Sequence, residues 1–265
     1  MDVLYGMHPV EEALRAGNRP VERLAVARER GHDSKMEALL ALARTKGVRV
    51  TTEGRDQLTK YAQDERHQGV VAFLQERKML VLEDLLHAAP RNGKSRFFLA
   101  LDGVEDPHNF GALLRSADGA GVDGVIVPER RSAPLSGVAA KTSAGASEHV
   151  RLAQVVNMTR ALEAMKKQNV WVVGLDERGT PDYTEFDFRQ DICLVLGAEG
   201  AGLHELVKRT CDHLLRIPMA GAVSSLNVSV AGAVVMFEAM RQRRGTMSAP
   251  VVASKAKPRK GLGSD

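Results

Sequence analysis

The second half of the chain alternates short apolar runs with longer amphipathic segments at a regular spacing. Each apolar run has the length of a buried strand, and each segment that follows is long enough for a helix. This alternation is typical of a parallel sheet covered by helices on both faces. The predicted strands cover residues 97–101, 124–127, 150–155, 170–175, 191–196 and 214–217, and the predicted helices cover about 109–120, 137–147, 157–167, 202–211 and 225–243.

Residues 1–74 show the same alternation on a smaller scale. A helix is expected to begin at His8-Pro9, because a proline in the first turn loses no hydrogen bond. A second helix is expected from Met36 to Lys46, with Gly47 as its C-cap. The pattern therefore predicts a small α/β sandwich, with a third helix at 57–62 and strands at 24–27, 48–51 and 70–74.

Two stretches lack a regular pattern. Residues 75–95 begin with charged side chains, can form a short helix from Val81 to Ala89, and end in loop-forming Pro, Asn and Gly. We interpret them as a linker that allows the domains to move relative to each other. Ser, Ala, Pro, Gly and Lys dominate residues 246–265, which predicts a basic, disordered tail. The expected units are therefore 1–74, the linker 75–95, a larger domain 96–245 and the tail 246–265.

Composition favours a globular protein of the cytoplasm. The 265 residues are 44% hydrophobic, enough for two modest cores. No run approaches the ~20 apolar residues of a membrane span, and no basic-then-apolar signal sequence opens the chain. Cys193 lies in an apolar strand and Cys211 near a helix end, so both are expected to be reduced structural thiols. The eight histidines are scattered singly, so no metal site is expected.

The positive net charge comes from the end of the chain. Residues 241–265 hold seven basic side chains against Asp265 alone, which leaves 30 basic and 32 acidic residues in the remainder. Charge therefore points to a basic tail rather than to a wholly basic protein. Such a tail commonly contacts phosphate, and it is equally common as a solvated terminus.

The run from Leu214 to Ala231 reads as a strand closed by Pro218, a loop of small residues, and a helix. Proline cannot donate to a strand ladder, and the Ala/Gly loop lets backbone approach a ligand. Ser224, Ser225 and Asn227 are candidate N-caps. Taken alone, this run is as consistent with a simple capped connection as with a binding loop.

Two further stretches, 101–117 and 194–203, also place a polar or Gly-rich break between a strand and a helix. Gly197 to Gly202 follows a buried strand, a context in which backbone amides can approach a nucleotide. Its spacing is not GxGxxG and no ribose-binding acid follows about 20 residues on, which disfavours a dinucleotide-binding enzyme. Taken alone, Asn109 is more simply a helix cap, and Arg115 a solvated side chain or a phosphate contact.

Together, 101–117, 194–203 and 214–231 resemble, in order and spacing, the three motifs of the SpoU (TrmH-type) family of S-adenosylmethionine-dependent RNA ribose 2′-O-methyltransferases. The resemblance covers nearly the whole chain. It implies a SPOUT α/β domain with a trefoil knot, a small N-terminal α/β RNA-binding domain and a homodimer. Within the family, residues 4–14 and His67-Gln68-Gly69-Val70 resemble the members that modify a guanosine of 23S rRNA, in the peptidyl-transferase region.

The resemblance also implies roles for individual residues. S-adenosylmethionine would be surrounded largely by main-chain groups of residues Gly197, Glu199, Gly200, Ile217, Pro218, Met219 and Leu226. The matching catalytic positions are Asn109, Arg115, Glu199, Ser225 and Asn227. Family proposals make the arginine a base, acting across the dimer interface. Because a guanidinium titrates above roughly 12, orientation of phosphate and 2′-oxygen is the simpler role for Arg115, and Glu199 is a candidate to pair with it.

The expected function is therefore 2′-O-methylation of a guanosine ribose in 23S rRNA. One alternative is a relative that acts on tRNA or on another rRNA ribose. Another is a non-catalytic RNA-binding module on the same scaffold, which the presence of all five polar motif positions disfavours.

Overall fold

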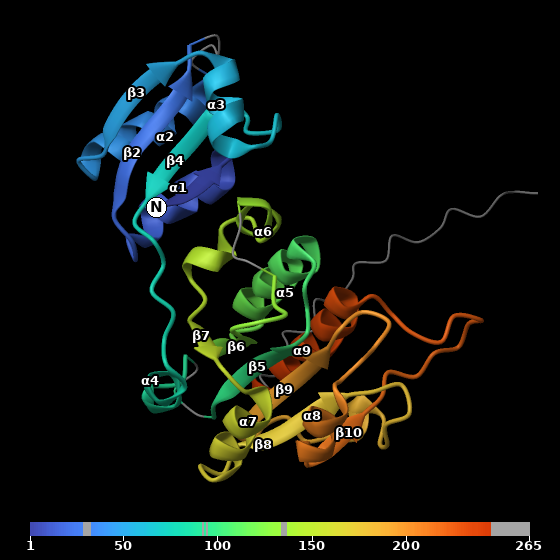
Figure 1. Cartoon of the computed structure of the whole chain (residues 1–265). Coiled ribbons are helices and arrows are strands. Elements are labelled where there is room, and N and C mark those ends of the chain that lie inside the picture. The colour runs from blue at the N-terminus through green and yellow to red at the C-terminus, as the bar shows by residue number, and fades with distance from the viewer. Residues whose placement is uncertain (29–32, 92, 94, 134–136, 245–265) are drawn as a thin grey trace, which may run out of the picture.

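The chain forms two α/β units, each built on its own sheet (Figure 1). The computed structural model describes residues 1–28, 33–91, 93, 95–133 and 137–244. The predicted tail 246–265 lies outside the described residues. The N-terminal unit and the larger unit touch where α1 (Met7–Ala16) of the first meets α6 (Gly137–Thr142) of the second.

The N-terminal unit is a four-stranded sheet in the order β1-β4-β2-β3, with β2 and β3 parallel and the other pairs antiparallel. Side chains alternate across a strand, so Leu24 and Val26 face α1 and α2 while Ala25 and Ala27 face α3. The elements are β1 (Asp2–Tyr5), α1 (Met7–Ala16), β2 (Val21–Ala27), α2 (Ser34–Thr45), β3 (Arg49–Glu53), α3 (Arg55–Ala62) and β4 (Val70–Leu74). The sequence analysis did not anticipate β1.

The connection between the units is less free than its composition indicates. Leu80 bridges to Ala153 in the larger unit, and α4 (Leu82–His87) buries Leu82, Leu85 and Leu86 in that unit's core. A mobile linker over all of 75–95 is therefore not what the structure shows, because three large apolar side chains attach this segment to the second sheet.

The larger unit contains a six-stranded parallel sheet in the order β10-β8-β9-β5-β6-β7, as the strand–helix alternation predicts. Its trefoil knot stays a prediction. The elements are β5 (Phe97–Asp102), α5 (Pro107–Gly119), β6 (Gly124–Pro128), α6 (Gly137–Thr142), η1 (Ala146–Glu148), β7 (Leu152–Val155), α7 (Met158–Lys166), β8 (Trp171–Leu175), η2 (Tyr183–Glu185), β9 (Ile192–Gly197), α8 (Glu205–Thr210), β10 (His213–Leu215) and α9 (Val228–Arg243).

Helices cover both faces of this sheet. Phe97, Leu99 and Leu101 of β5 pack in one cluster with α5 and α9. Phe98 and Ala100 point the other way and pack with α4, α7 and the start of α8. Every residue of β5 and β9 is buried, as expected for the central strands of a doubly covered sheet.

Local backbone chemistry shifts three predicted helix boundaries. The helix expected at 137–147 is broken after Thr142, because Ala144 and Gly145 take positive φ values of 51° and 87° before the short 3-10 turn η1. The helix expected at 202–211 begins at Glu205, since Gly202 has a φ of 69°. The helix expected at 225–243 begins at Val228, and Asn227 is its N-cap.

Candidate active site

Three strand ends bring the candidate motifs to one edge of the sheet. β5 ends at Asp102 and β9 at Gly197, and these strands are direct neighbours. β10 ends at Leu215 and pairs with β8, which in turn pairs with β9. Because all six strands are parallel, the segments that follow them lie at the same carboxyl edge, where open α/β sheets bind ligands.

A hydrogen-bonded cluster joins the three motifs. The Asn109 side-chain amide donates to Glu199 Oε2 at 3.0 Å, and the Asn227 amide donates to Asn109 Oδ1 at 3.0 Å and to Glu199 Oε1 at 3.1 Å. Asn227 Oδ1 in turn accepts from the backbone amide of Ser229 at 2.9 Å. The Glu199 carboxylate is thus held by two amides, from α5 and from the start of α9.

Asn109 is not the N-cap of α5, the role that its place near the helix start favours. Asp106 caps α5 by accepting from the backbone amide of His108 at 3.0 Å, and Asn109 lies inside the first turn, 7% exposed. Proline at N1 and aspartate at the N-cap fix where α5 starts. That start directs the Asn109 side chain inward, toward Glu199.

Arg115 lies apart from this cluster. It is an exposed residue of α5, it lines neither of the cavities below, and the described residues include no hydrogen-bond or ion-pair partner for it. Within one chain, Glu199 accepts from Asn109 and Asn227, so the predicted pair with Arg115 of the same chain does not form. The guanidinium is free to meet a group that comes from outside the folded chain.

The predicted cofactor residues line one cavity of about 490 Å³ at the carboxyl edge. Its walls include Gly197, Glu199, Gly200, Ile217, Met219, Ser225 and Leu226, while Pro218 lies between two of these residues without lining the space. Leu175 at the end of β8 and Asp176 directly after it also line this cavity, although no sequence motif marks them. Burial opposes ionisation of Asp176, but a 2.5 Å hydrogen bond from Lys208, a hydrogen bond from the Arg178 backbone amide and the positive charges of both side chains together outweigh it and lower the pKa of Asp176.

Gly197 makes room for the tight turn at the floor of this cavity. A Cβ there would lie 2.1 Å from the carbonyl carbon of Gly202 and 2.3 Å from the amide nitrogen of Leu203. The turn closes through two backbone hydrogen bonds between Ala198 and Gly202, at 3.0 and 2.9 Å. Backbone groups at residues 197–202 can therefore approach a ligand closely.

A second cavity of about 410 Å³ adjoins the first and shares Ala198, Glu199 and Val228 with it. Asn109 and Arg131 line it, and so does His204, which the sequence analysis did not single out. Asp102 holds His204 by accepting from its backbone amide at 2.8 Å and pairing with Nδ1 at 3.0 Å. Two ligands could therefore meet across the shared wall that contains Glu199.

Neither cysteine has the environment of a reactive thiol. Burial raises the pKa of Cys193 well above its usual range and that of Cys211 to about 12. Within the described ranges, no group of three or more His, Cys, Asp or Glu side chains could hold a metal ion. No described helix has both the length and the apolar character that crossing a membrane requires.

The fold and the site define a two-domain α/β protein with paired ligand cavities at the carboxyl edge of a parallel sheet. A model of the SpoU rRNA Methylase family matches residues 96–237, and a model of RNA 2′-O ribose methyltransferase substrate binding matches residues 3–80. The chain belongs to the SpoU rRNA methylase family. It is an RNA 2′-O-methyltransferase that uses S-adenosylmethionine.

Relatives of known structure or name agree with this assignment. The 23S rRNA (guanosine-2′-O-)-methyltransferase RlmB of Pectobacterium atrosepticum is 40% identical over 92% of this chain and 99% of its own. The SpoU methyltransferase AviRb from Streptomyces viridochromogenes, solved with AdoMet, has a TM-score of 0.76 at 28% identity, covering 91% of this chain and 90% of that chain. A structure concerned with 2-OH methylation of C/U34 on tRNA is 31% identical with a TM-score of 0.52, and covers 57% of this chain and 98% of that chain.

The residues of the larger cavity fit S-adenosylmethionine. Leu175, Ile217 and Leu226 supply apolar surface for a flat ring, and the closely packed turn at Gly197 exposes backbone groups for hydrogen bonds. The Glu199 carboxylate lies at the wall shared with the second cavity, where it can attract a sulfonium charge. When bound, the cofactor supplies the methyl group.

Proposed function

We propose that the chain methylates the ribose 2′-oxygen of a guanosine in 23S rRNA, in the peptidyl-transferase region. The observation that carries this proposal is the Asn109–Glu199–Asn227 cluster at the boundary between two adjoining cavities. One cavity fits the cofactor, and the other opens beside it for the target nucleoside.

Methyl transfer needs the 2′-oxygen held in line with the sulfonium methyl and a route for its proton. In this proposal Glu199 lies beside the developing charges, and the two asparagine amides fix its orientation. Ser225 lines the cofactor cavity, and in this proposal it hydrogen-bonds the reacting ribose. Arg115 lines neither cavity of its own chain, so in this proposal it reaches the phosphate and the 2′-oxygen across the dimer interface.

The extent of the matches favours rRNA over tRNA as the substrate. The relative whose name specifies a 23S rRNA guanosine matches through both units, whereas the structure concerned with tRNA covers 57% of this chain. The additional N-terminal unit coincides with the substrate-binding model over residues 3–80. In this proposal, that unit selects the RNA.

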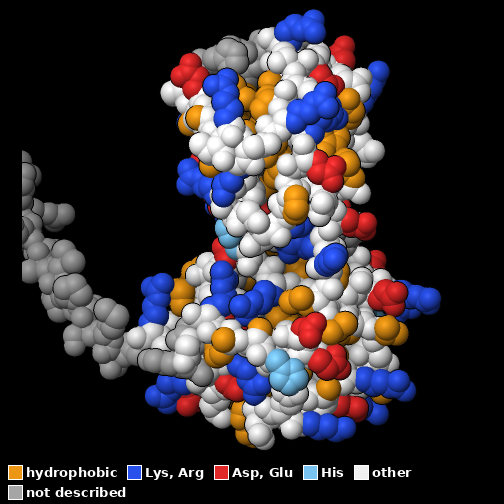
Figure 2. All heavy atoms as spheres, turned by 90° about the vertical axis from the view of Figure 1, so that its left-hand side faces the viewer, with side chains coloured by type: hydrophobic (Ala, Val, Ile, Leu, Met, Phe, Trp, Pro, Cys, Tyr) orange, Lys and Arg blue, Asp and Glu red, His pale blue; other side chains and the backbone are white. Residues whose placement is uncertain are grey.

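Surface charge is compatible with an RNA partner. Figure 2 shows Lys and Arg side chains distributed over this face of both units, with apolar side chains between them. Arg23 extends over the ring of Phe73 at 4.1 Å and over that of Tyr61 at 5.3 Å. Arg23 Nη1 also donates to Glu53 Oε1 at 2.6 Å, so only the remaining guanidinium nitrogens are available to phosphate.

We further propose that the enzyme is a homodimer through α9 and the loop before it. Val230 is 48% and Phe237 44% exposed on α9, and Val223 is 68% exposed in the loop. Val230 and Phe237 are seven residues apart on α9 and therefore lie on the same side of that helix. Phe237→Asp should convert a dimer in sedimentation equilibrium to a monomer, and a wild-type monomer would contradict the proposal.

The central experiment maps 2′-O-methylation on total RNA with and without the protein, and repeats the transfer with purified enzyme and S-adenosylmethionine. The proposal expects one protein-dependent guanosine in 23S rRNA. A protein-dependent site in tRNA instead would establish the alternative substrate. Absence of cofactor binding in calorimetry, together with no methylation, would favour a non-catalytic RNA-binding module.

A further inference from the structure

The segment from α6 to η1, residues 137–149, lies between the two units and packs tightly against both. On the catalytic side, a Cβ at Gly111 of α5 would lie 2.5 Å from the Ala139 carbonyl oxygen and 2.7 Å from Thr142 Cβ. On the other side, a Cβ at Gly137 would lie 2.6 Å from the Tyr5 ring. We call residues 137–149 the platform.

Two further contacts attach the platform to the N-terminal unit. Ala140 is 2% exposed and belongs to the same apolar cluster as α1, α2 and β1. A Cβ at Gly145 would lie 2.6 Å from Glu12 Cβ. Close-packed surfaces of this kind transmit a displacement instead of absorbing it. A movement of the N-terminal unit therefore reaches α5, the helix that carries Asn109 and Arg115.

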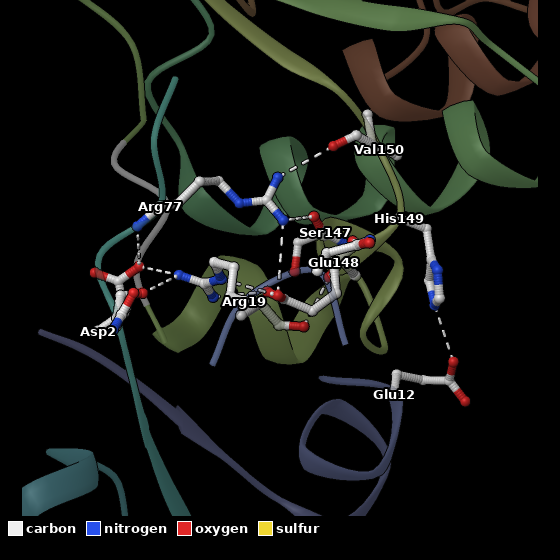
Figure 3. A network of polar contacts seen from close by, with 12 residues as sticks. Asp2, Glu12, Arg19, Arg77, Ser147, Glu148, His149 and Val150 are labelled. Atoms are coloured by element: carbon white, nitrogen blue, oxygen red, sulfur yellow. Dashed lines mark hydrogen bonds and ion pairs between the residues drawn. The ribbon is translucent and has the colours of Figure 1, made fainter. Parts of the chain in front are cut away.

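A buried charge cluster fixes the orientation of this contact (Figure 3). The Arg19 side chain is 8% exposed and the Glu148 side chain 2%. They form a fork of two hydrogen bonds, Nε to Oε2 at 3.0 Å and Nη2 to Oε1 at 2.8 Å. Two parallel bonds between planar groups define an angle as well as a distance.

Arg77 and Asp2 complete the cluster. Arg77 donates to the carbonyl oxygens of Ser147 and Val150, the latter at 3.1 Å, and lies 3.7 Å from the Glu148 carboxylate. Asp2 pairs with Arg19 and accepts from the Arg77 backbone amide at 3.2 Å. Two positive and two negative side chains thus balance, and they come from β1, the loop after α1, the segment after β4, and η1.

A second group of polar contacts surrounds the cluster. The Asn18 side-chain amide donates to the Glu148 carbonyl oxygen at 2.7 Å, and His149 Nε2 lies 3.0 Å from Glu12 Oε2. Lys141 Nζ donates to the Arg66 carbonyl oxygen at 3.0 Å. Hydrogen bonds and ion pairs, which have preferred directions, therefore join the N-terminal unit to the platform at several separate points. A purely apolar contact would allow the two surfaces to slide.

We propose that Arg19, Arg77 and Glu148 are positioning residues for methyl transfer, which hold the substrate-binding unit at one angle to α5. This inference rests on the proposed function, because it assigns the N-terminal unit to the RNA. RNA held by that unit then reaches the second cavity at a fixed distance from Asn109. Buried ion pairs are best known for specifying one arrangement among several, which is the task here.

The test compares Glu148→Gln and Arg19→Lys with the control Glu11→Gln. The first removes a charge with little change of shape, and the second keeps the charge but loses the fork. The control removes a carboxylate of the N-terminal unit that forms an exposed 2.5 Å pair with Arg15. Cofactor affinity and the thermal unfolding midpoint report whether each variant keeps its fold.

Two measurements test the proposal itself. Single-turnover methylation of 23S rRNA should fall about tenfold or more in both variants at unchanged cofactor affinity, since misplacement by about 1 Å can cost a hundredfold. Spin labels are attached at Lys46→Cys and Arg209→Cys in a Cys211→Ser background, and the labelled protein is diluted with unlabelled protein. The distribution of distances between the two labels should be broader in both variants than in the protein with Arg19 and Glu148 unchanged. The double variant Arg19→Gln/Glu148→Gln restores charge balance and should recover part of the rate.

Wild-type rates with an unchanged, narrow distance distribution in both variants would overturn the proposal. A broader distribution with an unchanged rate would also overturn it, because orientation would then not matter for transfer. If wild-type protein methylates no RNA, the proposed function fails. The distance measurement still reports whether the charge cluster fixes the N-terminal unit against the platform. The control should match the wild type in every measurement.

Discussion

Burial and hydrogen bonding decide what several ionisable side chains of this chain can do. Arg241 and Arg243 belong to the basic end of the sequence, and both have partners within the chain. Arg241 pairs with Glu238 at 2.7 Å, and Arg243 donates to backbone carbonyl oxygens of Ser95, Arg96 and Phe188. Burial lowers the pKa of Arg243 to about 10. Charge counted along the sequence therefore overstates the charge available to a phosphate backbone.

His67 gives a prediction for the pH dependence of stability. It is 0% exposed, and its Nδ1 accepts from the Gly69 backbone amide at 3.0 Å, which requires a neutral ring with its proton on Nε2. Burial, with a smaller effect of Arg55, lowers the pKa of His67 below 6.5. The unfolded chain then binds more protons, so stability is present above pH 6.5 and is lost as pH falls through the folded pKa.

The test compares how the thermal unfolding midpoints of the wild type and of His67→Asn change between pH 7.5 and about 5. Asparagine can still accept from the Gly69 amide but does not titrate. The wild-type midpoint should fall more steeply with acid than that of the variant, by about 2 to 4 °C per kcal/mol lost in a chain of this size. Parallel curves would assign the acid sensitivity to other groups.

Arg115 gives a prediction for catalysis, because it matches a catalytic position of the family although its exposed side chain lines neither cavity of its own chain. Arg115→Ala should leave cofactor affinity nearly unchanged and reduce single-turnover methyl transfer on the order of a hundredfold. Arg115→Lys keeps the charge and loses the planar fork. Recovery with lysine would indicate simple attraction of phosphate, and failure to recover would indicate guanidinium geometry. Normal turnover in the alanine variant would remove Arg115 from the active site.

At the scale of elements, the ends of β5, β9 and β10 decide where ligands bind, and glycine decides how closely they approach. Gly197 is the last residue of β9, and a side chain there would collide with the backbone of the turn that follows. Gly221, in the exposed loop before α9, has no atom within 4 Å of the position of a Cβ. The two glycines are therefore a matched pair.

Gly197→Ala should weaken S-adenosylmethionine binding on the order of tenfold or more, because overpacking costs about 1–3 kcal/mol and displaces the turn. Gly221→Ala should bind with wild-type affinity. Isothermal titration measures both, and circular dichroism checks that each variant is folded. Equal affinities for the two variants would mean that the 197–202 turn is not part of the cofactor site.

Periodicity predicts the strands of the larger unit and three of the four strands of the N-terminal unit, because buried strands are apolar, and a parallel sheet forces its ligand loops to one edge. Side-chain partners are harder to predict. Glu199 is 84 residues from Arg115 and 90 from Asn109 along the chain, and only the start of α5, set by Asp106 and Pro107, decides which of them it meets. The Asp102–His204 pair carries no local signal, since its spacing matches no motif.

At the scale of the whole molecule, the boundary between the units falls before α4 rather than after it. Leu82, Leu85 and Leu86 pack with Ile126, Leu162 and Met165 of the second core. The connection between the two units is thus the short segment 75–79, which joins the end of β4 to the bridge at Leu80. A truncated protein must keep α4 if the catalytic sheet is to remain covered.

A chain beginning at Glu76 should bind S-adenosylmethionine within a few-fold of wild type and lose 23S rRNA methylation, because the cofactor residues all lie beyond residue 174. A chain beginning at Arg91 should fail to fold, since losing three core leucines costs about 2–5 kcal/mol each. Calorimetry and methylation assays check the first, and solubility with circular dichroism checks the second. Full methylation by the shorter chain would mean that the N-terminal unit does not recognise the RNA.

The strand order of the catalytic sheet also sets the sequence of events during synthesis. β5 is a central strand, and its Phe97 pairs with Ile192 of β9. One edge of β5 therefore stays unpaired until nearly a hundred further residues have left the ribosome. The N-terminal unit has all four strands by Leu74 and can fold while β5 is still being made. Translation thus completes the domain that we assign to rRNA first, on a nascent chain whose catalytic sheet is still open.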